Sequence, residues 1–81
     1  MRPSISVVVI TKNEEMNIES CLQSIHGWAE EIIVLDDEST DRTVELASKY
    51  TTRVLHRSMD NEGRHRNWAY SQAKHDWVLS L

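Results

Sequence analysis

Two adjacent carboxylates, Asp36 and Asp37, stand directly after the apolar run Ile-Ile-Val-Leu at residues 32–35. Such a run, without polar alternation, is typical of a strand that is buried on both faces in a parallel sheet. In open α/β sheets, ligands bind just beyond the carboxyl ends of the strands. Because two acids that leave a buried strand are costly unless they hold something, this pair is the first candidate for a binding site.

Polar residues occur in similar places elsewhere in the chain. The β-branched stretch at residues 4–10 predicts a first strand, and a polar turn at residues 11–15 follows it. Arg66 lies near the start of the last predicted helix. A carboxylate can accept a hydrogen bond from a nucleobase, and an arginine can bind a phosphate with two parallel hydrogen bonds. The candidate nucleotide site at this edge of the sheet consists of Thr11, Asn13, Glu14, Asp36, Asp37 and Arg66.

The two common glycine-rich phosphate loops are absent. With only Gly27 and Gly63, the sequence contains neither the dinucleotide fingerprint nor the Walker loop. A nucleotide that binds here would therefore be held by side chains at the strand ends.

The first half of the chain predicts two helices that flank a strand at residues 31–36. The first helix is predicted from an apolar face at helical spacing, and it stops near Gly27. This face consists of Ile18, Cys21, Leu22, Ile25 and Trp28. Glu14 and Glu15 would lie near its first turn, where the helix dipole favours acids. The second helix would start at one of three N-cap candidates and run to about Tyr50. These candidates are Ser39, Thr40 and Asp41, and the core face would be Thr43 or Val44, Ala47 and Tyr50.

The second half predicts strands at residues 52–56 and 77–81, a polar loop at 57–62 and a helix at 63–74 that carries Ala69 and Ala73. The alternation of strands and helices predicts an α/β fold with a parallel, Rossmann-like sheet in the order βαβαβαβ and helices on both faces. The chain ends at the fourth strand, so we expect residues 1–81 to be an incomplete half-domain.

Bulk composition excludes several classes of protein. A formal net charge of −4 argues against a nucleic-acid binder, which usually carries a basic surplus. The longest apolar runs, at residues 7–10 and 32–35, are far shorter than the ~18 residues that suggest a membrane span. The amino terminus has no apolar signal segment, and Cys21 is alone, so we expect a cytoplasmic protein without an internal disulfide.

The chain resembles the amino-terminal part of the family 2 glycosyltransferases, which are inverting enzymes with a GT-A fold. The matching segments are Ser-Val-Val-Val-Ile-Thr-Lys-Asn-Glu at 6–14, Val-Leu-Asp-Asp-Glu-Ser-Thr-Asp-Arg-Thr at 34–43, Gly-Arg-His-Arg-Asn at 63–67 and Trp-Val-Leu-Ser-Leu at 77–81. They span nearly the whole chain in the order of the family. Their spacing is most similar to the bacterial enzymes that build lipopolysaccharide core sugars.

This resemblance implies a role for each candidate residue. Thr11, Asn13 and Glu14 would line the nucleotide site. Asp37 would contact the uracil ring of a UDP-sugar, with Asp36 supporting that loop, and Arg66 would lie near the base or the phosphates. The family usually has glycine where this chain has Glu38 and alanine where it has His65, and the first difference affects the turn after Asp37.

The resemblance also implies parts that lie outside this chain. The acidic motif of the family (Asp-x-Asp), which binds Mg²⁺ or Mn²⁺ on the donor diphosphate, should follow Leu81 directly, and the catalytic base lies further on. The metal neutralises the leaving group, and the base deprotonates the acceptor hydroxyl. The piece alone is therefore expected to be inactive. The acceptor of the whole enzyme would be a glycan or glycolipid, which leaves room for peripheral membrane association.

Simpler interpretations remain open for each feature. The alternative function is a complete, non-catalytic, flavodoxin-like module that binds a nucleotide or a partner. Asp36 and Asp37 could form a solvated loop in which one acid caps a helix, and residues 11–15 could be a loop that only starts one. Arg66 could be a surface charge within a solvated basic cluster, and Cys21 a buried, inert thiol. The four histidines show no metal-ligand spacing. A sheet with one bare face would also self-associate through apolar surface and unpaired strand edges.

Overall fold

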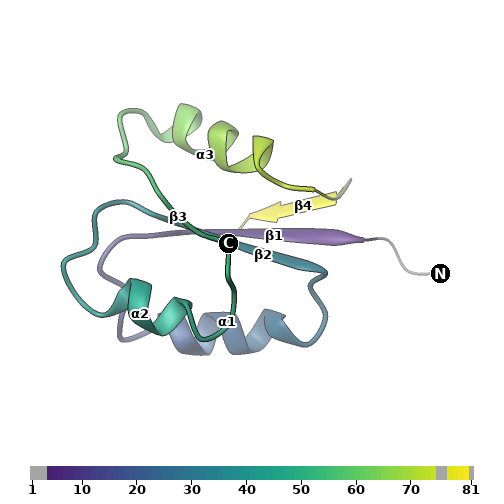
Figure 1. Cartoon of the computed structure of the whole chain (residues 1–81). Coiled ribbons are helices and arrows are strands. Elements are labelled where there is room, and N and C mark those ends of the chain that lie inside the picture. Colours follow the sequence, from purple (N-terminus) through teal and green to yellow (C-terminus); the bar gives the residue numbers. More distant parts are fainter. Residues whose placement is uncertain (1–3, 75–76, 81) are drawn as a thin grey trace.

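The computed structural model describes residues 4–74 and 77–80 and shows strands and helices in strict alternation (Figure 1). The elements are β1 (Ile5–Thr11), α1 (Ile18–His26), β2 (Glu31–Asp36), α2 (Thr43–Ala47), β3 (Val54–His56), α3 (Glu62–Ser71) and β4 (Trp77–Ser80). The predicted βαβαβαβ order is therefore confirmed. Residues 75, 76 and 81, which belong to the predicted fourth strand or the segment before it, lie outside the described residues.

The four strands form one parallel sheet in the order β3-β2-β1-β4. Each central strand is an apolar run, Val7 to Val9 in β1 and Ile32 to Leu35 in β2, and these residues are buried. The register pairs Thr11 with Asp36 at the end of β1 and β2. The last residues of these two strands therefore lie side by side at the carboxyl edge.

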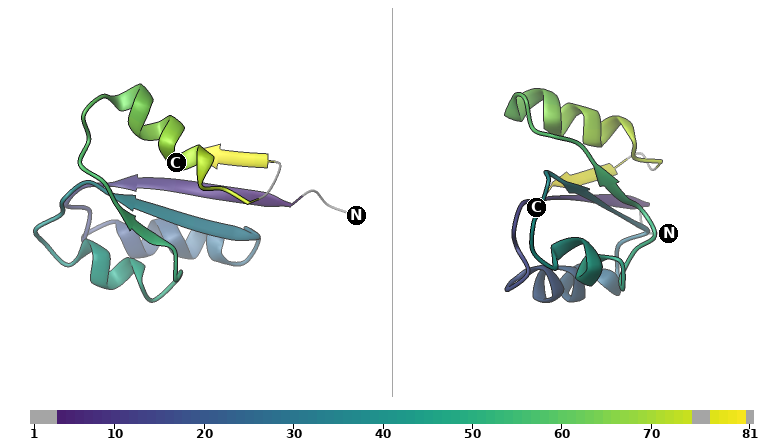
Figure 2. Two further views of the ribbon diagram at one scale, coloured as in Figure 1. Left: turned by 45° about the horizontal axis from the view of Figure 1, so that its top comes forward. Right: turned by 60° about the vertical axis from the view of Figure 1, so that its left-hand side comes forward.

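Helices cover both faces of the sheet, as the sequence predicts (Figures 1 and 2). The apolar face of α1 packs with Leu46 and Ala47 of α2 on one face, against alternate residues of β1 and β2. On the other face, Ala69 and Trp68 of α3 pack on the intervening residues of the same strands. The alternation of side chains along a strand thus divides two apolar runs between two cores.

Some element boundaries differ from the prediction. β1 extends to Thr11, so this threonine belongs to the strand and not to the turn. α1 begins at Ile18, after a turn in which Glu14 O accepts from Ile18 N–H, so Glu14 and Glu15 precede the helix. β3 has three residues instead of five, and α3 runs from Glu62 to Ser71 instead of residues 63–74.

The prediction for α2 is wrong at its start and its end, whereas its core face is confirmed for Thr43 and Ala47 but omitted Leu46. The helix begins at Thr43, and its N-cap position is Arg42, which makes no side-chain cap. Ser39 and Thr40 bond to the loop after β1, and Asp41 bonds both to that loop and to the Thr43 amide, as described below. The helix also ends at Ala47, and its buried residues are Thr43, Leu46 and Ala47, whereas Val44 and Tyr50 are half-buried.

A cluster at the amino edge ties α3 to the sheet. Glu31 accepts hydrogen bonds from the Ser6 hydroxyl at 2.8 Å and the Lys74 amide at 2.9 Å, and it pairs with Arg53 at 2.5 Å. Arg53 also donates to Gln72 O at 2.7 Å, at the end of α3. Burial acts to raise the pKa of Glu31, but these hydrogen bonds and Arg53 outweigh it and lower that pKa. Arg53 is thus a structural residue, not part of a solvated basic cluster.

Two further observations concern the single cysteine and the possibility of a membrane span. Cys21 is half-buried, and this burial, followed by the charge of Glu14, raises the pKa of its thiol. Within residues 4–74 and 77–80, no helix is long and apolar enough to cross a membrane.

Candidate functional site

The two acids after β2 occupy different environments. Asp36 is buried, with 1% of the residue exposed. It accepts a hydrogen bond from the Thr11 hydroxyl at 2.9 Å, from the Ser39 amide at 2.9 Å and from the Ser39 hydroxyl at 2.6 Å. Both of its oxygens are therefore engaged with β1 and with the loop after β2.

Asp37 has one oxygen engaged with backbone and one that faces a cation. Its Oδ1 accepts from the Met59 amide at 2.9 Å. Its Oδ2 lies 4.0 Å from the ammonium of Lys12, whose side chain is 62% exposed. A weakly held, solvent-exposed ammonium can be displaced at little cost, since exposed ion pairs contribute only about 0–1 kcal/mol. Asp37 is therefore the acid of the pair that remains able to accept a hydrogen bond from a ligand.

The loops after β1 and β2 are joined by hydrogen bonds that begin with Asn13. Asn13 N–H donates to the Ser39 hydroxyl at 2.8 Å, and its Oδ1 accepts from Thr40 N–H at 2.8 Å. The amide of Asp37 in turn donates to Thr11 O at 2.9 Å. These contacts bring five of the six predicted site residues together at the carboxyl edge.

Glu14 and its neighbour are held by the start of α2. Glu14 N–H donates to the hydroxyl of Thr43 at 2.8 Å, and Glu15 N–H donates to Asp41 Oδ2 at 3.2 Å. Asp41 Oδ1 accepts from both the amide and the hydroxyl of Thr43. These hydrogen bonds, above all the one from the Thr43 hydroxyl, lower the pKa of Asp41. The Ser-Thr-Asp cluster therefore binds the neighbouring loop, and Asp41 in addition accepts from the first amide of α2.

Both loops contain a residue with positive φ, Asn13 at 51° and Glu38 at 52°. Asparagine visits this left-handed region more readily than most residues, and its side chain here is bonded to the other loop. Glu38 has the backbone conformation that glycine adopts most easily. The turn after Asp37 thus has a backbone conformation that suits the glycine expected from the resemblance, although this chain has a glutamate at position 38.

Arg57 links the third strand to this edge. Its amide donates to Asp36 O at 3.1 Å, and its guanidinium lies 5.6 Å from the centre of the Trp68 ring. The same guanidinium is 3.2 Å from Nδ1 of His65, which is fully buried. Nε2 of His65 has no hydrogen-bond partner among the described residues. The Arg57 side chain is therefore packed on α3 and not on a solvated face.

Arg66, the sixth predicted residue, belongs to α3. Its guanidinium pairs with Glu62 at 3.5 Å, one turn earlier, and its side chain is 38% exposed. The amino-terminal end of α3 lies toward the same end of the molecule as the tips of β1 and β2 (Figure 1). Arg66 is thus carried by the middle of α3 and not by either of the two loops described above.

The described residues do not form a metal site by themselves. Among residues 4–74 and 77–80, no group of three histidine, cysteine, aspartate or glutamate side chains could hold a metal ion. The oxygens of Asp36 already accept hydrogen bonds from Thr11 and Ser39, and Oδ1 of Asp37 accepts one from Met59, which leaves only Oδ2 of Asp37 in the acidic pair without a hydrogen bond from the described residues. Any metal at this edge would need ligands beyond these residues.

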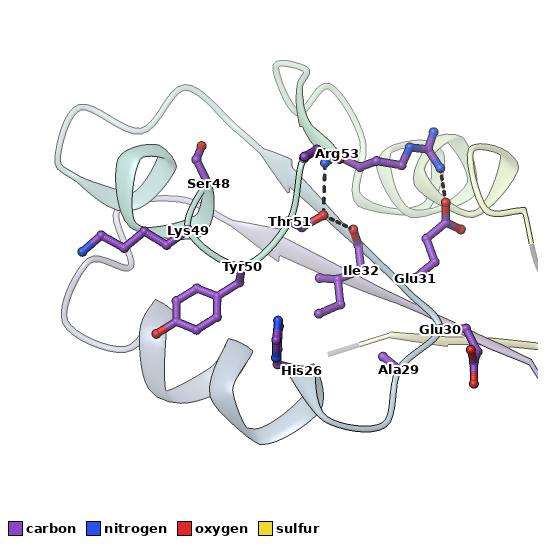
Figure 3. A pocket seen from close by; sticks show the side chains of 11 residues that line it. His26, Ala29, Glu30, Glu31, Ile32, Ser48, Lys49, Tyr50, Thr51 and Arg53 are labelled. Carbon is purple, nitrogen blue, oxygen red and sulfur yellow. Dashed lines mark hydrogen bonds and ion pairs between the residues drawn. The ribbon is translucent and has the colours of Figure 1, made fainter.

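A hollow lies at the opposite, amino edge of the sheet (Figure 3). It has a volume of about 540 Å³ and lies between the end of α1, the start of β2 and the connection from α2 to β3. His26 and Tyr50 contact each other at its wall, with ring centres 5.9 Å apart. The guanidinium of Arg53 is bonded to Glu31 and Gln72 instead of being free for a ligand. The size of this hollow therefore does not identify it as the functional site.

A Rossmann-like parallel sheet with polar loops at its carboxyl edge is the class of domain that binds ligands at that edge. Comparison with known proteins gives the family. The profile of glycosyl transferase family 2 matches residues 6–81. The chain therefore belongs to this family, and its fold is of the GT-A type.

Solved structures and curated relatives agree with this assignment. Glucosyl-3-phosphoglycerate synthase from Mycobacterium tuberculosis, in complex with Mg²⁺ and UDP, is 30% identical with a TM-score of 0.84 and covers 98% of this chain and 32% of its own. An uncharacterized glycosyltransferase of Rickettsia bellii is 36% identical over 95% of this chain and 26% of its own length. Dolichol-phosphate mannosyltransferase of Pyrococcus furiosus is 39% identical over 69% of this chain and 18% of its own. The chain thus spans about a quarter to a third of the first two proteins.

Several residues at this edge were not predicted from the sequence as part of the site. They are Lys12, Ser39, Asp41, Thr43, Arg57 and Met59. Ser39, Asp41 and Thr43 carried a signal, a polar cluster directly after the acidic pair, which local rules interpret as a helix start. Met59 acts through its backbone amide, so its side-chain type carried no signal.

Proposed function

We propose that this chain is the nucleotide-binding part of an inverting glycosyltransferase that uses a UDP-sugar donor. The observation that carries the proposal is the state of Asp37. One of its oxygens is fixed by the Met59 amide at 2.9 Å, and the other faces only the exposed ammonium of Lys12 among the contacts described. A carboxylate that is oriented in this way, at the carboxyl edge of a parallel sheet, is suited to accept the N–H of a uracil ring.

The surrounding loops support this assignment. Thr11 O accepts from the Asp37 amide, Asn13 and Glu14 bond to residues that follow Asp37 in the chain, and Asp36 joins the two loops. Arg66 on α3 is the residue we assign to the base or the phosphates. Relatives provide further support, since glucosyl-3-phosphoglycerate synthase of Mycobacterium tuberculosis has been solved with Mn²⁺, UDP-glucose and phosphoglyceric acid and is 32% identical to this chain.

The remaining parts of the proposal concern the whole protein. It would transfer the sugar to an acceptor hydroxyl on a glycan or glycolipid, in bacterial cell-surface glycan synthesis, in the cytoplasm or at the inner face of the membrane. Mg²⁺ or Mn²⁺ on the diphosphate would be held by residues that follow Leu81, and a carboxylate further on would act as the base. The 81-residue chain alone is expected to bind the nucleotide weakly and to transfer no sugar.

The test is a calorimetric and NMR titration of the 81-residue chain with UDP, with and without Mn²⁺. We expect weak binding that is indifferent to metal, with shifts near Thr11, Asp37 and Arg66. Asp37→Ala should weaken binding about tenfold or more, because a hydrogen bond to a charged group contributes about 1.5–3 kcal/mol. The matched control is Asp60→Ala, which removes an exposed carboxylate that pairs with Arg57 at 3.4 Å. Equal affinities of the Asp37 and Asp60 variants would refute the assignment of Asp37.

A further inference from the structure

Two threonine hydroxyls at opposite edges of the sheet each accept from a backbone amide and donate to an oxygen. At the carboxyl edge, the Thr43 hydroxyl donates to Asp41 Oδ1 and accepts from Glu14 N–H at 2.8 Å. At the amino edge, the Thr51 hydroxyl donates to Ile32 O at 2.7 Å and accepts from Arg53 N–H at 3.0 Å (Figure 3). The first bridge reaches the loop that carries candidate site residues, whereas the second lies far from it.

Beyond Thr11, the hydrogen bonds that the structure describes from the loop after β1 to the loop after β2 and the start of α2 go to residues 39–43. Ser39 and Thr40 bond to Asn13, Thr43 bonds to the amide of Glu14, and Asp41 bonds to the amide of Glu15. Three of these contacts engage backbone amides of the loop after β1 itself, so they set the path of that loop and not the position of one side chain. Thr43 is fully buried, so water cannot easily replace its hydroxyl.

We propose that Thr43 and Asp41 are positioning residues of the nucleotide site, which hold the main chain of residues 13–15 in place and thereby raise nucleotide affinity. This proposal rests on the proposed function. Thr43 and Asp41 act through the amides of Glu14 and Glu15, not through contact with the nucleotide. If the loop is released, only a fraction of the molecules has the binding conformation, and the apparent affinity falls by that fraction.

The informative variants are Thr43→Val, which keeps the shape but removes the hydroxyl, and Thr43→Ser, which keeps the hydroxyl. Losing one hydrogen bond of ordinary strength should weaken UDP binding about fivefold to tenfold in Thr43→Val. Thr43→Ser should restore the affinity to within about twofold. The matched control is Thr51→Val, which should lower the melting temperature but leave UDP affinity unchanged. A purely structural role predicts instead that both valine variants weaken binding in step with their loss of stability, and that result would overturn the proposal.

Amide hydrogen exchange, measured without nucleotide in the original chain and in Thr43→Val, tests whether Thr43 holds the loop after β1. Glu14 N–H and Glu15 N–H should exchange slowly, and Thr43→Val should speed the exchange of Glu14 more than that of Arg53. Exchange of Glu14 at the rate of an unstructured peptide would overturn the proposal. If Thr43→Val does not fold, Asp41→Asn at a half-exposed position takes its place, and wild-type affinity in that variant would also overturn the proposal. A chain that binds no UDP, but in which Thr43→Val still releases Glu14, would refute the proposed function while the positioning of the loop stands.

Discussion

Replacing Glu38 by glycine should stabilise the protein, and the reason lies in its backbone. Glu38 has φ of 52°, in the left-handed region, and its side chain is exposed. An L-residue pays roughly 1–2 kcal/mol for this conformation. Glycine avoids that cost but loses about 0.5–1 kcal/mol through the greater freedom of the unfolded chain. The net expectation for Glu38→Gly is a gain of about 0.5–1 kcal/mol in the free energy of unfolding.

Two further variants separate the backbone effect from the side-chain effect. Glu38→Ala removes the same carboxylate but keeps a Cβ, so its stability should stay within about 0.5 kcal/mol of the original chain. Asn13→Gly relieves a similar φ of 51° but loses the hydrogen bond from Thr40 N–H at 2.8 Å. Because that bond contributes about 1 kcal/mol, and asparagine tolerates the left-handed region, Asn13→Gly should destabilise the protein.

Urea unfolding and thermal melts of the full chain measure these differences. For a domain of this size, the expected gain in Glu38→Gly corresponds to a rise in melting temperature of about 2–8 °C. If Glu38→Gly is no more stable than Glu38→Ala, the carboxylate and not the backbone conformation determines the effect, and the reasoning is refuted. A gain of stability in Asn13→Gly would show that its bond to Thr40 contributes little.

Two other predictions follow from the amino edge and from the sheet. Because the pKa of Glu31 is lowered in the folded protein, its contacts stabilise the fold above the ordinary pKa of 4.5, and this stabilisation is lost as the pH falls through the lower folded-state pKa. Glu31→Gln should therefore lower the free energy of unfolding by about 1–3 kcal/mol at pH 7. In urea unfolding from pH 7 to 3, the stability of this variant should depend less on pH than that of the original chain. We also expect the chain to self-associate through the edges of β3 and β4, so light scattering well above micromolar concentration should detect oligomers, and a clean monomer would contradict this.

The sequence predicts the sheet well because its strands are governed by local composition. The runs at residues 7–10 and 32–35 have too few polar residues for any surface element, and β1 and β2 form there. The short α2 was predicted poorly for the opposite reason. Ser39, Thr40 and Asp41 have the residue types of an N-cap, but they bond to the loop after β1, a partner 26 or 27 residues away. Rules based on neighbouring residues cannot predict hydrogen bonds between residues so far apart in the sequence.

The different hydrogen-bond partners of Asp36 and Asp37 follow from the register of the sheet, which cannot be predicted from the sequence alone. Because Thr11 is paired with Asp36 across β1 and β2, the Thr11 hydroxyl is placed to bond the first acid and not the second. Ser39 then completes the shell of Asp36, whereas Asp37, one residue beyond the strand, meets the Met59 amide and the Lys12 ammonium. A change of register by one residue would exchange these environments. The assignment of Asp37 as the ligand-binding acid therefore depends on strand pairing. Thr11→Val should remove a hydrogen bond from Asp36 and weaken the contacts between the two loops, with a smaller effect on the hydrogen bond from the Met59 amide to Asp37.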